Sequence, residues 1–324
     1  GNILVLLWER RTQEEALLAG KVSHTGDIWS EKIIEIEPVF PDSVNIVWEW
    51  YLWDHLVQDL NPNLDNFGVI SNNPGKLNIN YALTSNEGPQ PPQFTNADFI
   101  HLNAIDYNEN LKLITFSSRK TNEIYIINHD ISPYESSTDM GDFIYRWGNP
   151  RIYDRGTYSN QILYAPHSVN WTSDFSLIIF NNGVNRPEGN YSSIELIDLP
   201  TLDNGEYYLD NNQPFEPILS TTNYNLNGNF YTANQGGAYL LENNNILATI
   251  STMKRILEIN QVGEIVFDFY YDGNGSIPRT QKYASNYLNN NSLIGDLNFD
   301  NMLDILDIII LVNIIKSNTE YNSS

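Results

Sequence analysis

Short apolar runs separated by polar turns make up most of this chain. The runs span about four to seven residues, as β-strands do, and are rich in Ile, Val, Leu, Trp and Tyr. Asn, Gly, Asp and Pro bound them, as in "SDFSLIIFNNG" at residues 173–183. Apolar runs bounded by turn residues are typical of strands in a sheet that is buried on both faces. We therefore predict an all-β fold for the larger part of the protein.

The strand pattern recurs in copies along the chain. Each copy holds four short strands, and the first copy lacks its first strand. The copies cover residues 1–10, 31–39 and 44–56; 101–130 and 141–150; 167–183 and 191–200; and 236–273. Such repetition predicts a β-propeller, with six blades in the full protein and the opening blades missing here. A β-sandwich with irregular loops is the alternative fold.

The pattern changes after residue 285. The sequence "NYLNNNSL" is Asn-rich and has no strand or helix period, which indicates a linker. A helix with apolar residues around most of its circumference is expected over 305–315. We predict three parts: a propeller at 1–285, a linker at 286–294 and a calcium-binding segment at 295–324.

The segment "DLNFDNMLDILD" has the spacing of a calcium loop. Oxygen ligands recur at loop positions 1, 3, 5, 7, 9 and 12, the arrangement that suits Ca²⁺. The predicted ligands are Asp296, Asn298, Asp300, Met302 through its carbonyl, Asp304 through water and Asp307. The alternative is an acidic start to a helix without a metal. The loop and the following Asp-Ile resemble one half of a type I dockerin, a small EF-hand-like module. This resemblance implies an extracytoplasmic protein and a cohesin-like or surface-anchoring partner.

Two histidines and two arginines stand at the ends of strands. His101 begins "HLNAIDY" and His167 begins "HSVNW", while Arg119 and Arg186 follow the next strand in each copy. If the copies are blades, we expect the four side chains to meet at one mouth of the propeller. Arginine binds a tetrahedral oxyanion with two hydrogen bonds, and histidine can attack or carry a proton near pH 7. The alternative is a structural role for the histidines between blades.

Residues 1–272 resemble the bacterial arylsulfotransferase family of β-propellers. The stretches that carry the resemblance include "WEWYLWDHLVQD", "DFIHLNAIDYN", "APHSVNW" and "IIFNNGVNRPEGNYSSIELI". The family transfers a sulfuryl group from a phenolic sulfate ester to a phenolic acceptor through a sulfated histidine, without a nucleotide cofactor. By position, the resemblance implies catalytic roles for His101, His167 and Arg186. His55, in the matching motif "WDH", and Arg119 are further candidate catalytic residues.

One feature departs from that family. Its best-studied members use a histidine of a late blade as the acceptor of the sulfuryl group, whereas the late copy here reads "YTANQGGAYLLENNN". Another histidine then takes that role, transfer is direct, or the chemistry differs. Two other functions stay open: a non-catalytic propeller that binds glycans or proteins, and a hydrolase or lyase of sulfated or uronic polymers.

Composition narrows the partners. The net charge is -23 over 324 residues, which disfavours nucleic acids and anionic membranes because the long-range field repels polyanions. An anionic small substrate requires local arginines. No cysteine is present, so disulfides and thiolate chemistry are excluded. The apolar stretch at 305–315 is too short to span a bilayer. The chain starts at Gly1 directly in a strand, so we expect a processed or truncated product.

Overall fold

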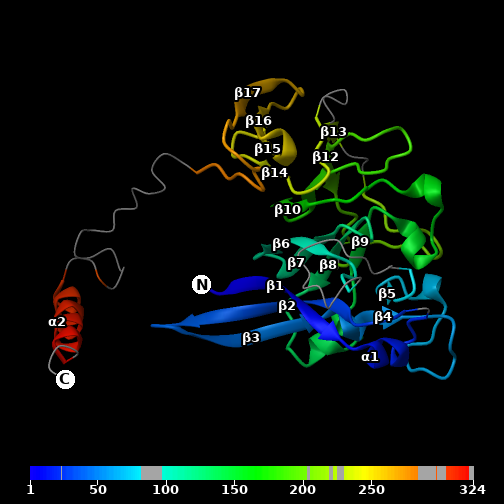
Figure 1. Ribbon diagram of the computed structural model, residues 1–324, viewed down its shortest axis with the longest axis horizontal. Coiled ribbons are helices and arrows are strands. Elements are labelled where there is room, and N and C mark those ends of the chain that lie inside the picture. The colour runs from blue at the N-terminus through cyan, green and yellow to red at the C-terminus, as the bar shows by residue number, and fades with distance from the viewer. Residues whose placement is uncertain are drawn as a thin grey trace. The chain divides into compact units, whose positions relative to one another are not determined.

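The computed structural model describes residues 1–22, 24–81, 97–202, 205–218, 222–224, 230–283, 297 and 304–320. Side chains at 222–223 and 314–320 are not among them. The chain divides into two compact units, Gly1–Thr280 and Gln281–Ser324. Figure 1 colours the chain from the N-terminus to the C-terminus, and the strands lie in the first unit.

Four antiparallel sheets follow one another along the first unit (Figure 1). The first has three strands: β1 (Ile3–Arg11), β2 (Ile28–Val39) and β3 (Ser43–Tyr51). The second has β6 (Leu102–Asn108), β7 (Leu113–Ser118), β8 (Glu123–Asn128) and β9 (Tyr145–Trp147). The third has β10 (Ser168–Ser173), β11 (Ser176–Asn181), β12 (Ser193–Asp198) and β13 (Thr222–Tyr224). The fourth has β14 (Gly237–Leu240), β15 (Ile246–Ile250), β16 (Arg255–Ile259) and β17 (Ile265–Tyr270).

Short elements connect these sheets. The helix α1 (Gln13–Leu18) begins at Thr12, whose hydroxyl accepts from the Glu15 amide while the Glu15 carboxylate accepts from the Thr12 amide. The strands β4 (Leu56–Val57) and β5 (Leu77–Asn78) form a small parallel pair. The short 3₁₀ turns are η1 (Leu52–His55), η2 (Ile70–Asn72), η4 (Glu135–Ser137), η5 (Asp139–Gly141), η6 (Pro150–Tyr153), η7 (Tyr158–Asn160) and η9 (Ser251–Met253).

The first strands of the later sheets lie side by side. β10 contacts β6 on one side and β14 on the other, and β1 contacts β6. Trp8, near the end of β1, lies beside His101, which immediately precedes β6. β1 therefore runs antiparallel to the first strand β6, as the second strand of a sheet does. The expected copies are therefore present as sheets, and the first lacks its first strand among the described residues. Separate successive sheets differ from the two facing sheets of a sandwich. A closed ring and six blades remain predictions.

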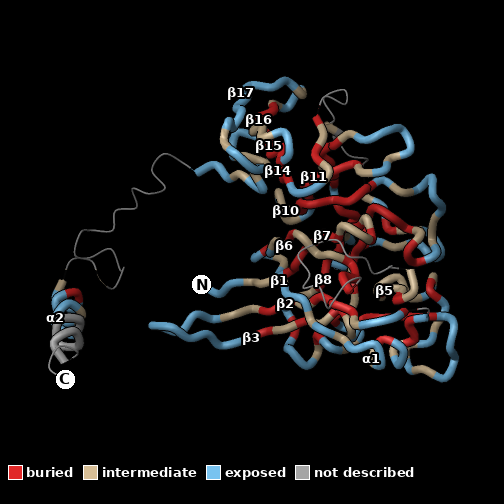
Figure 2. Tube along the Cα trace, in the orientation of Figure 1, coloured by how far each residue is buried: buried red, intermediate tan, exposed pale blue. Residues whose placement is uncertain are grey.

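The apolar runs are explained by burial on both faces. In β11, Leu177 and Ile179 belong to one hydrophobic cluster, while Ile178 and Phe180 belong to the next. Because alternate side chains of a strand point to opposite faces, the sheet packs against a neighbour on each side. Figure 2 shows this burial through the middle sheets, whereas every residue of β17 is exposed.

A buried ion pair lies within the second sheet. Arg146 of β9 donates to both carboxylate oxygens of Glu123 at the start of β8, and both side chains are completely buried. Its guanidinium also donates to the carbonyls of Pro74 and Lys76 and lies over the ring of Tyr153. With its remaining donors satisfied, this pair joins β8 and β9 to the loop before β5.

The second unit contains the helix α2 (Ile305–Glu320). Six of its first eight residues are large and exposed apolar side chains: Ile305, Leu306, Ile308, Ile309, Leu311 and Val312. None of the helices in the described ranges is long and apolar enough to cross a membrane. The linker predicted at 286–294 lies outside the described residues.

Candidate functional site

His101 is held in an unusual backbone conformation just before β6. Its φ is 56°, in the left-handed region that few residues other than glycine adopt. Its amide donates to Oε1 of Glu31 at 2.7 Å, the amide of Ile100 donates to the same oxygen at 3.2 Å, and its carbonyl accepts from the amide of Arg119 at 3.1 Å. Backbone strain of this kind persists only where the surroundings fix it, and it is frequent at active sites.

The ring of His101 is oriented by a buried carboxylate. Its Nδ1 lies 2.9 Å from Oδ2 of Asp98, and Nζ of Lys120 lies 2.7 Å from the same oxygen. Asp98 and Glu31 are both buried, and Oδ1 of Asp98 and Oε2 of Glu31 have no hydrogen-bond partner. Burial and the neighbouring charge of Asp98 raise the pKa of Glu31 to about 8. Glu31 is therefore neutral at pH 7, and Asp98 is the carboxylate that faces the His101 ring and the Lys120 ammonium group.

His167 has a different set of partners. Its Nδ1 lies 2.9 Å from Oδ1 of Asn182 and 3.2 Å from the carbonyl oxygen of Ala165. The amide nitrogen of Asn182 donates to the carbonyls of Thr232 and Gln235, which fixes its oxygen towards the ring. Both partners of Nδ1 are acceptors, so Nδ1 carries the proton and Nε2 keeps its lone pair.

The charge state of His167 follows from its surroundings. Burial, reinforced by the charge of Arg119 and then of His101, lowers the pKa of His167 to about 4. The ring is therefore neutral at pH 7. Hydrogen bonds bring this ring into one neighbourhood with His101 and Arg119. Asn103, two residues after His101, donates to the carbonyl of Pro166 beside His167 at 2.8 Å, and Arg119 donates to Ala233, which lies between the two carbonyls that hold Asn182. We call His101, His167 and Arg119 the histidine site.

The two histidines are not at equivalent positions, which corrects the expectation from the sequence. The left-handed residue before β10 is Ala165, with φ 55°, and it matches His101. The amides of Lys120 and Gly183 donate to the carbonyls of Ile100 and Tyr164, one residue before each left-handed position. His167 therefore stands two residues later than His101 in its copy.

The two arginines differ as well. Arg119, immediately after β7, donates from Nη1 to the carbonyl of Ala233 at 3.0 Å. Arg186 donates to the carbonyl of Tyr191 and to the Ser193 hydroxyl, lies 3.9 Å from Glu195 and is nearly buried.

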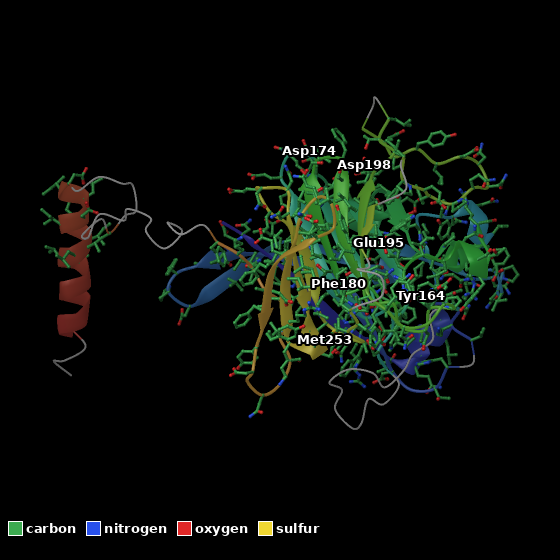
Figure 3. All side chains as sticks on the ribbon, turned by 90° about the horizontal axis from the view of Figure 1, so that it is seen from above. Tyr164, Asp174, Phe180, Glu195, Asp198 and Met253 are labelled. Atoms are coloured by element: carbon green, nitrogen blue, oxygen red, sulfur yellow. The ribbon has the colours of Figure 1, made fainter. Side chains whose placement is uncertain are left out.

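The matching positions expected for the two arginines are wrong. The backbone hydrogen bonds described above show that the residue equivalent to Arg119 in the next copy is Asn182, not Arg186. The guanidinium of Arg186 is stacked over the rings of Tyr191 and Tyr164. Figure 3 labels Tyr164 and Glu195, two of its partners, and shows Asp174 and Asp198 together at the other end of the third sheet.

His55 is enclosed at another place in the fold. The ring is completely buried and stacks on Trp50 with centroids 5.1 Å apart. Nδ1 lies 2.8 Å from Oδ1 of Asp142, and Nε2 lies 2.9 Å from the carbonyl of Ser136. Both ring nitrogens are thus occupied, and these partners are separate from the residues around His101. The structure does not bring His55 to the histidine site, so its inclusion there is corrected.

A cavity of about 330 Å³ lies next to the histidine site. Its lining is mostly apolar and consists of Leu6, Leu7, Trp8, Glu31 and Leu102. A second cavity of about 440 Å³ lies further along β1 and β6, and His129 is among its lining residues. Trp8 packs against Trp29 with ring centroids 4.9 Å apart and meets the ring of His101 at 6.5 Å. An aromatic wall thus connects the smaller cavity to His101.

Sequence reasoning missed three residues of this neighbourhood. Asp98 stands three residues before His101 in "ADFIH", and Lys120 follows Arg119 in "SSRK". A charged residue so close to each candidate was a usable signal. Glu31 offered none, because it reaches His101 from a strand 70 residues away.

The predicted calcium loop is described only in part. Asp296, Asn298, Asp300 and Met302 lie outside the described residues. Asp307 is buried, and its two carboxylate oxygens accept from the amides of Leu297 at 2.6 Å and Asp304 at 3.0 Å. The carboxylate at loop position 12 therefore points back towards loop positions 2 and 9, and the calcium site stays a prediction. In the described ranges, no group of three His, Asp or Glu side chains has an arrangement that could hold a metal ion.

Comparisons with known proteins place most of the first unit in one family. The family model described as arylsulfotransferase (ASST) matches residues 1–274. No curated protein matches the chain.

Several solved structures are similar over part of their length. The β-propeller domain of Cps50 (Swd1) from Myceliophteria thermophila is 10% identical, with 77% of this chain and 56% of that chain covered and a TM-score of 0.36. A catalytically inactive variant of virginiamycin B lyase from Staphylococcus aureus, with quinupristin, is 16% identical, with 53% and 56% covered and a TM-score of 0.28. A Bacteroides caccae protein of unknown function is 12% identical, with 76% and 72% covered and a TM-score of 0.29. The chain spans little more than half the length of the first two.

Proposed function

Because this chain belongs to the arylsulfotransferase family, we propose that it transfers a sulfuryl group from a phenolic sulfate ester to a phenolic acceptor at the histidine site. The observation that carries the proposal is the meeting of two histidines and an arginine beside an apolar cavity, within the residues that the family model matches. The reaction needs no nucleotide cofactor, since the donor ester already carries the activated group.

His167 is the acceptor of the sulfuryl group in this proposal. A neutral imidazole with its proton on Nδ1 offers the Nε2 lone pair for attack on sulfur. Burial and the charge of Arg119 lower the pKa of His167 to about 4, so the lone pair is available at any neutral pH. A weakly basic nitrogen also leaves sulfur readily when the second phenol attacks. This assignment fills the role that the late sheet, which begins at Gly237 without a histidine, does not fill.

Arg119 supplies the positive charge. Sulfuryl transfer, like phosphoryl transfer, spreads negative charge over the peripheral oxygens of the group in flight, so the protein contributes position and charge. The charge of Arg119 already acts on the His167 ring. Arg186 is held between tyrosines and hydroxyls near Tyr164, and its role is to hold the loop before His167 in place.

The smaller cavity accommodates the ring of the phenol. Its walls of leucine and tryptophan suit an aromatic group. Glu31 and Trp8 line this cavity and both contact His101, so a ring bound there lies close to His101.

The test is a transfer assay with 4-nitrophenyl sulfate as donor and phenol as acceptor. We expect phenol-dependent release of 4-nitrophenol, lost in His167→Ala and reduced about 100-fold or more in Arg119→Ala, as for removal of one charge-stabilising donor. His129→Ala is the matched control, because His129 pairs with Glu35 outside the histidine site and should keep full activity. Equal loss in His129→Ala, or full activity in His167→Ala, would contradict the proposal.

A non-catalytic secreted protein that binds glycans or proteins is the second candidate. The absence of a histidine from the sequence of the late copy favours it. In that case the folded wild-type protein releases no 4-nitrophenol, and the arginine variants change binding to a glycan or protein array instead.

The C-terminal segment extends the proposal. Asp296, Asn298, Asp300, Met302, Asp304 and Asp307 would hold one Ca²⁺. The inward carboxylate of Asp307 supports this site. Calcium there would fix the loop that begins α2. A calcium-loaded half-dockerin implies an extracytoplasmic location and attachment to a cohesin-like or surface partner.

A further inference from the structure

Asp98 and Lys120 form an ion pair beside His101, and the proposed reaction assigns no role to it. Oδ2 of Asp98 accepts from both Nδ1 of His101 and Nζ of Lys120, at 2.9 and 2.7 Å. Asp98 is completely buried, three residues before His101. A buried carboxylate bonded to the ring nitrogen of a histidine fixes which of the two nitrogens carries the first proton.

The backbone of His101 is constrained in the same way. Glu31 accepts the amide of His101, Arg119 donates to its carbonyl, and the left-handed φ of 56° is thereby maintained. The ring has an aromatic contact with Trp8. Position, tilt and tautomer of this one side chain are all determined by neighbours, which is what a group that must exchange a proton in a fixed direction requires.

We propose that Asp98 is a positioning residue, which holds the first proton of His101 on Nδ1 and so makes Nε2 the atom that exchanges a proton with the phenols. This inference rests on the proposed sulfuryl transfer. It divides the work between the two histidines: His167 takes the sulfuryl group and His101 carries the proton.

The two half-reactions balance with these roles. In the first, the Nε2 lone pair of His167 forms a bond to sulfur, and the bond from sulfur to the aryl oxygen breaks. The leaving oxygen takes the electron pair and receives the proton from Nε2 of His101. In the second, the acceptor phenol gives its proton to Nε2 of His101 and its oxygen attacks sulfur. The nitrogen–sulfur bond breaks, and its electron pair returns to His167.

The charges around His101 support this division. Asp98 and Lys120 face its ring side, Glu31 faces its backbone, and Arg119 and His167 complete the neighbourhood. Glu31 is neutral at pH 7 because burial and then Asp98 raise its pKa to about 8. Asp98 places a carboxylate 2.9 Å from Nδ1 of His101, whereas His167 has only the neutral amide of Asn182 and a carbonyl beside Nδ1.

The first experiment compares Asp98→Asn with the wild type on two donors. 4-Nitrophenyl sulfate has a good leaving group that needs little protonation, whereas 4-methylphenyl sulfate has a poor one that depends on it. We expect Asp98→Asn to lower kcat about 100-fold for the methylphenyl donor and less than about fivefold for the nitrophenyl donor, with KM nearly unchanged. Asp142→Asn is the matched control, since it makes the same change in the His55 pair, whose nitrogen–oxygen distance is 2.8 Å. It should lower the rates with both donors equally or not at all.

A second experiment needs neither activity nor a variant of Asp98. The chain has five histidines, so ¹⁵N ring signals can be assigned by comparison with His101→Gln. The inference predicts that the neutral ring of His101 keeps its proton on Nδ1, and that only Nε2 titrates. If the wild type shows no transfer, the proposed function fails, while this tautomer still tests the role of Asp98. A proton on Nε2 of neutral His101, or equal losses with both donors in Asp98→Asn, would overturn the inference.

Discussion

At the scale of single residues, three histidines of this chain differ in what faces their ring nitrogens. His101 faces the carboxylate of Asp98, His167 faces the amide oxygen of Asn182, and His55 faces the carboxylate of Asp142. The carboxylate of Asp98 can balance a second proton, whereas the neutral surroundings of His167 oppose one. His55 has no nitrogen left for a substrate. The neighbours therefore decide which histidine could attack and which could carry a proton.

A residue-scale prediction concerns Glu31. Burial raises its pKa from 4.5 to about 8, so the stability that its neutral form contributes is complete below pH 4.5 and is lost as pH rises towards 8. Glutamine imitates the neutral acid, and its amide oxygen can still accept from the amides of His101 and Ile100. We expect Glu31→Gln to increase the free energy of unfolding by about 2 kcal/mol at pH 8 and by nearly nothing at pH 4.5. Urea unfolding at the two pH values measures it.

The control for that prediction is Glu109→Gln. Glu109 is exposed, and the change removes the same formal charge. Its effect should be small and alike at both pH values. Equal stabilisation by Glu31→Gln at pH 4.5 and pH 8 would mean that ionisation of Glu31 is not the cause.

At the scale of elements, the inner strands β7, β11 and β15 of the later sheets are almost completely buried, and this explains why strands such as β11 are apolar without alternation. β1, at the edge of the first sheet, has no fully buried residue, and both cavities lie along it. β17 is the exception at the outer edge, with all six residues exposed. His101 and His167 immediately precede the first strands β6 and β10, and these two strands contact each other.

An element-scale prediction concerns the loop before α2. If Asp307 closes a calcium loop, isothermal titration calorimetry should show one Ca²⁺ bound per chain. Asp307→Asn should weaken that binding at least about tenfold, because one carboxylate ligand is lost. Asp272→Asn, an exposed change in the first unit, is the control. Identical titrations for the wild type and Asp307→Asn would contradict the site.

At the scale of the whole molecule, a net charge of -23 surrounds a site proposed to bind an anion. Arg119 and Lys120 oppose that field only locally. Dissolved salt screens the long-range repulsion over about 10 Å at 0.1 M, while it affects close contacts less. Binding of the anionic substrate should therefore strengthen as ionic strength rises, whereas in a basic protein it would weaken.

The resulting prediction is a fall in KM for the aryl sulfate as salt rises. Between 0.01 and 0.3 M NaCl we expect a decrease of about two- to tenfold, because repulsion of the anion is screened. The KM of the neutral phenol acceptor serves as the internal control and should stay constant. Steady-state kinetics with each substrate varied in turn provides the measurement. A KM for the sulfate ester that rises with salt would show that local cations dominate.

Much of the fold follows from local pattern. Runs such as "LIIF" between turn residues indicate strands buried on both faces, and their recurrence indicates sheets of four with an incomplete first one. The placement of His101 and His167 near one another also follows, since both precede first strands of adjacent sheets. Their exact equivalence does not hold, because Ala165, and not His167, has the backbone conformation and pairing of His101.

Local patterns in the chain were enough to specify the strands, their order and the family of the first unit, because apolar periodicity and turn chemistry act between near neighbours. Which groups meet depended on tertiary packing instead. Packing brought Glu31 to His101, 70 positions away, and brought Asp142 and Ser136 to His55, 87 and 81 positions away. These contacts form between segments that are distant in the chain, and they decide how the His101 backbone is held and which ring nitrogens of His55 are occupied.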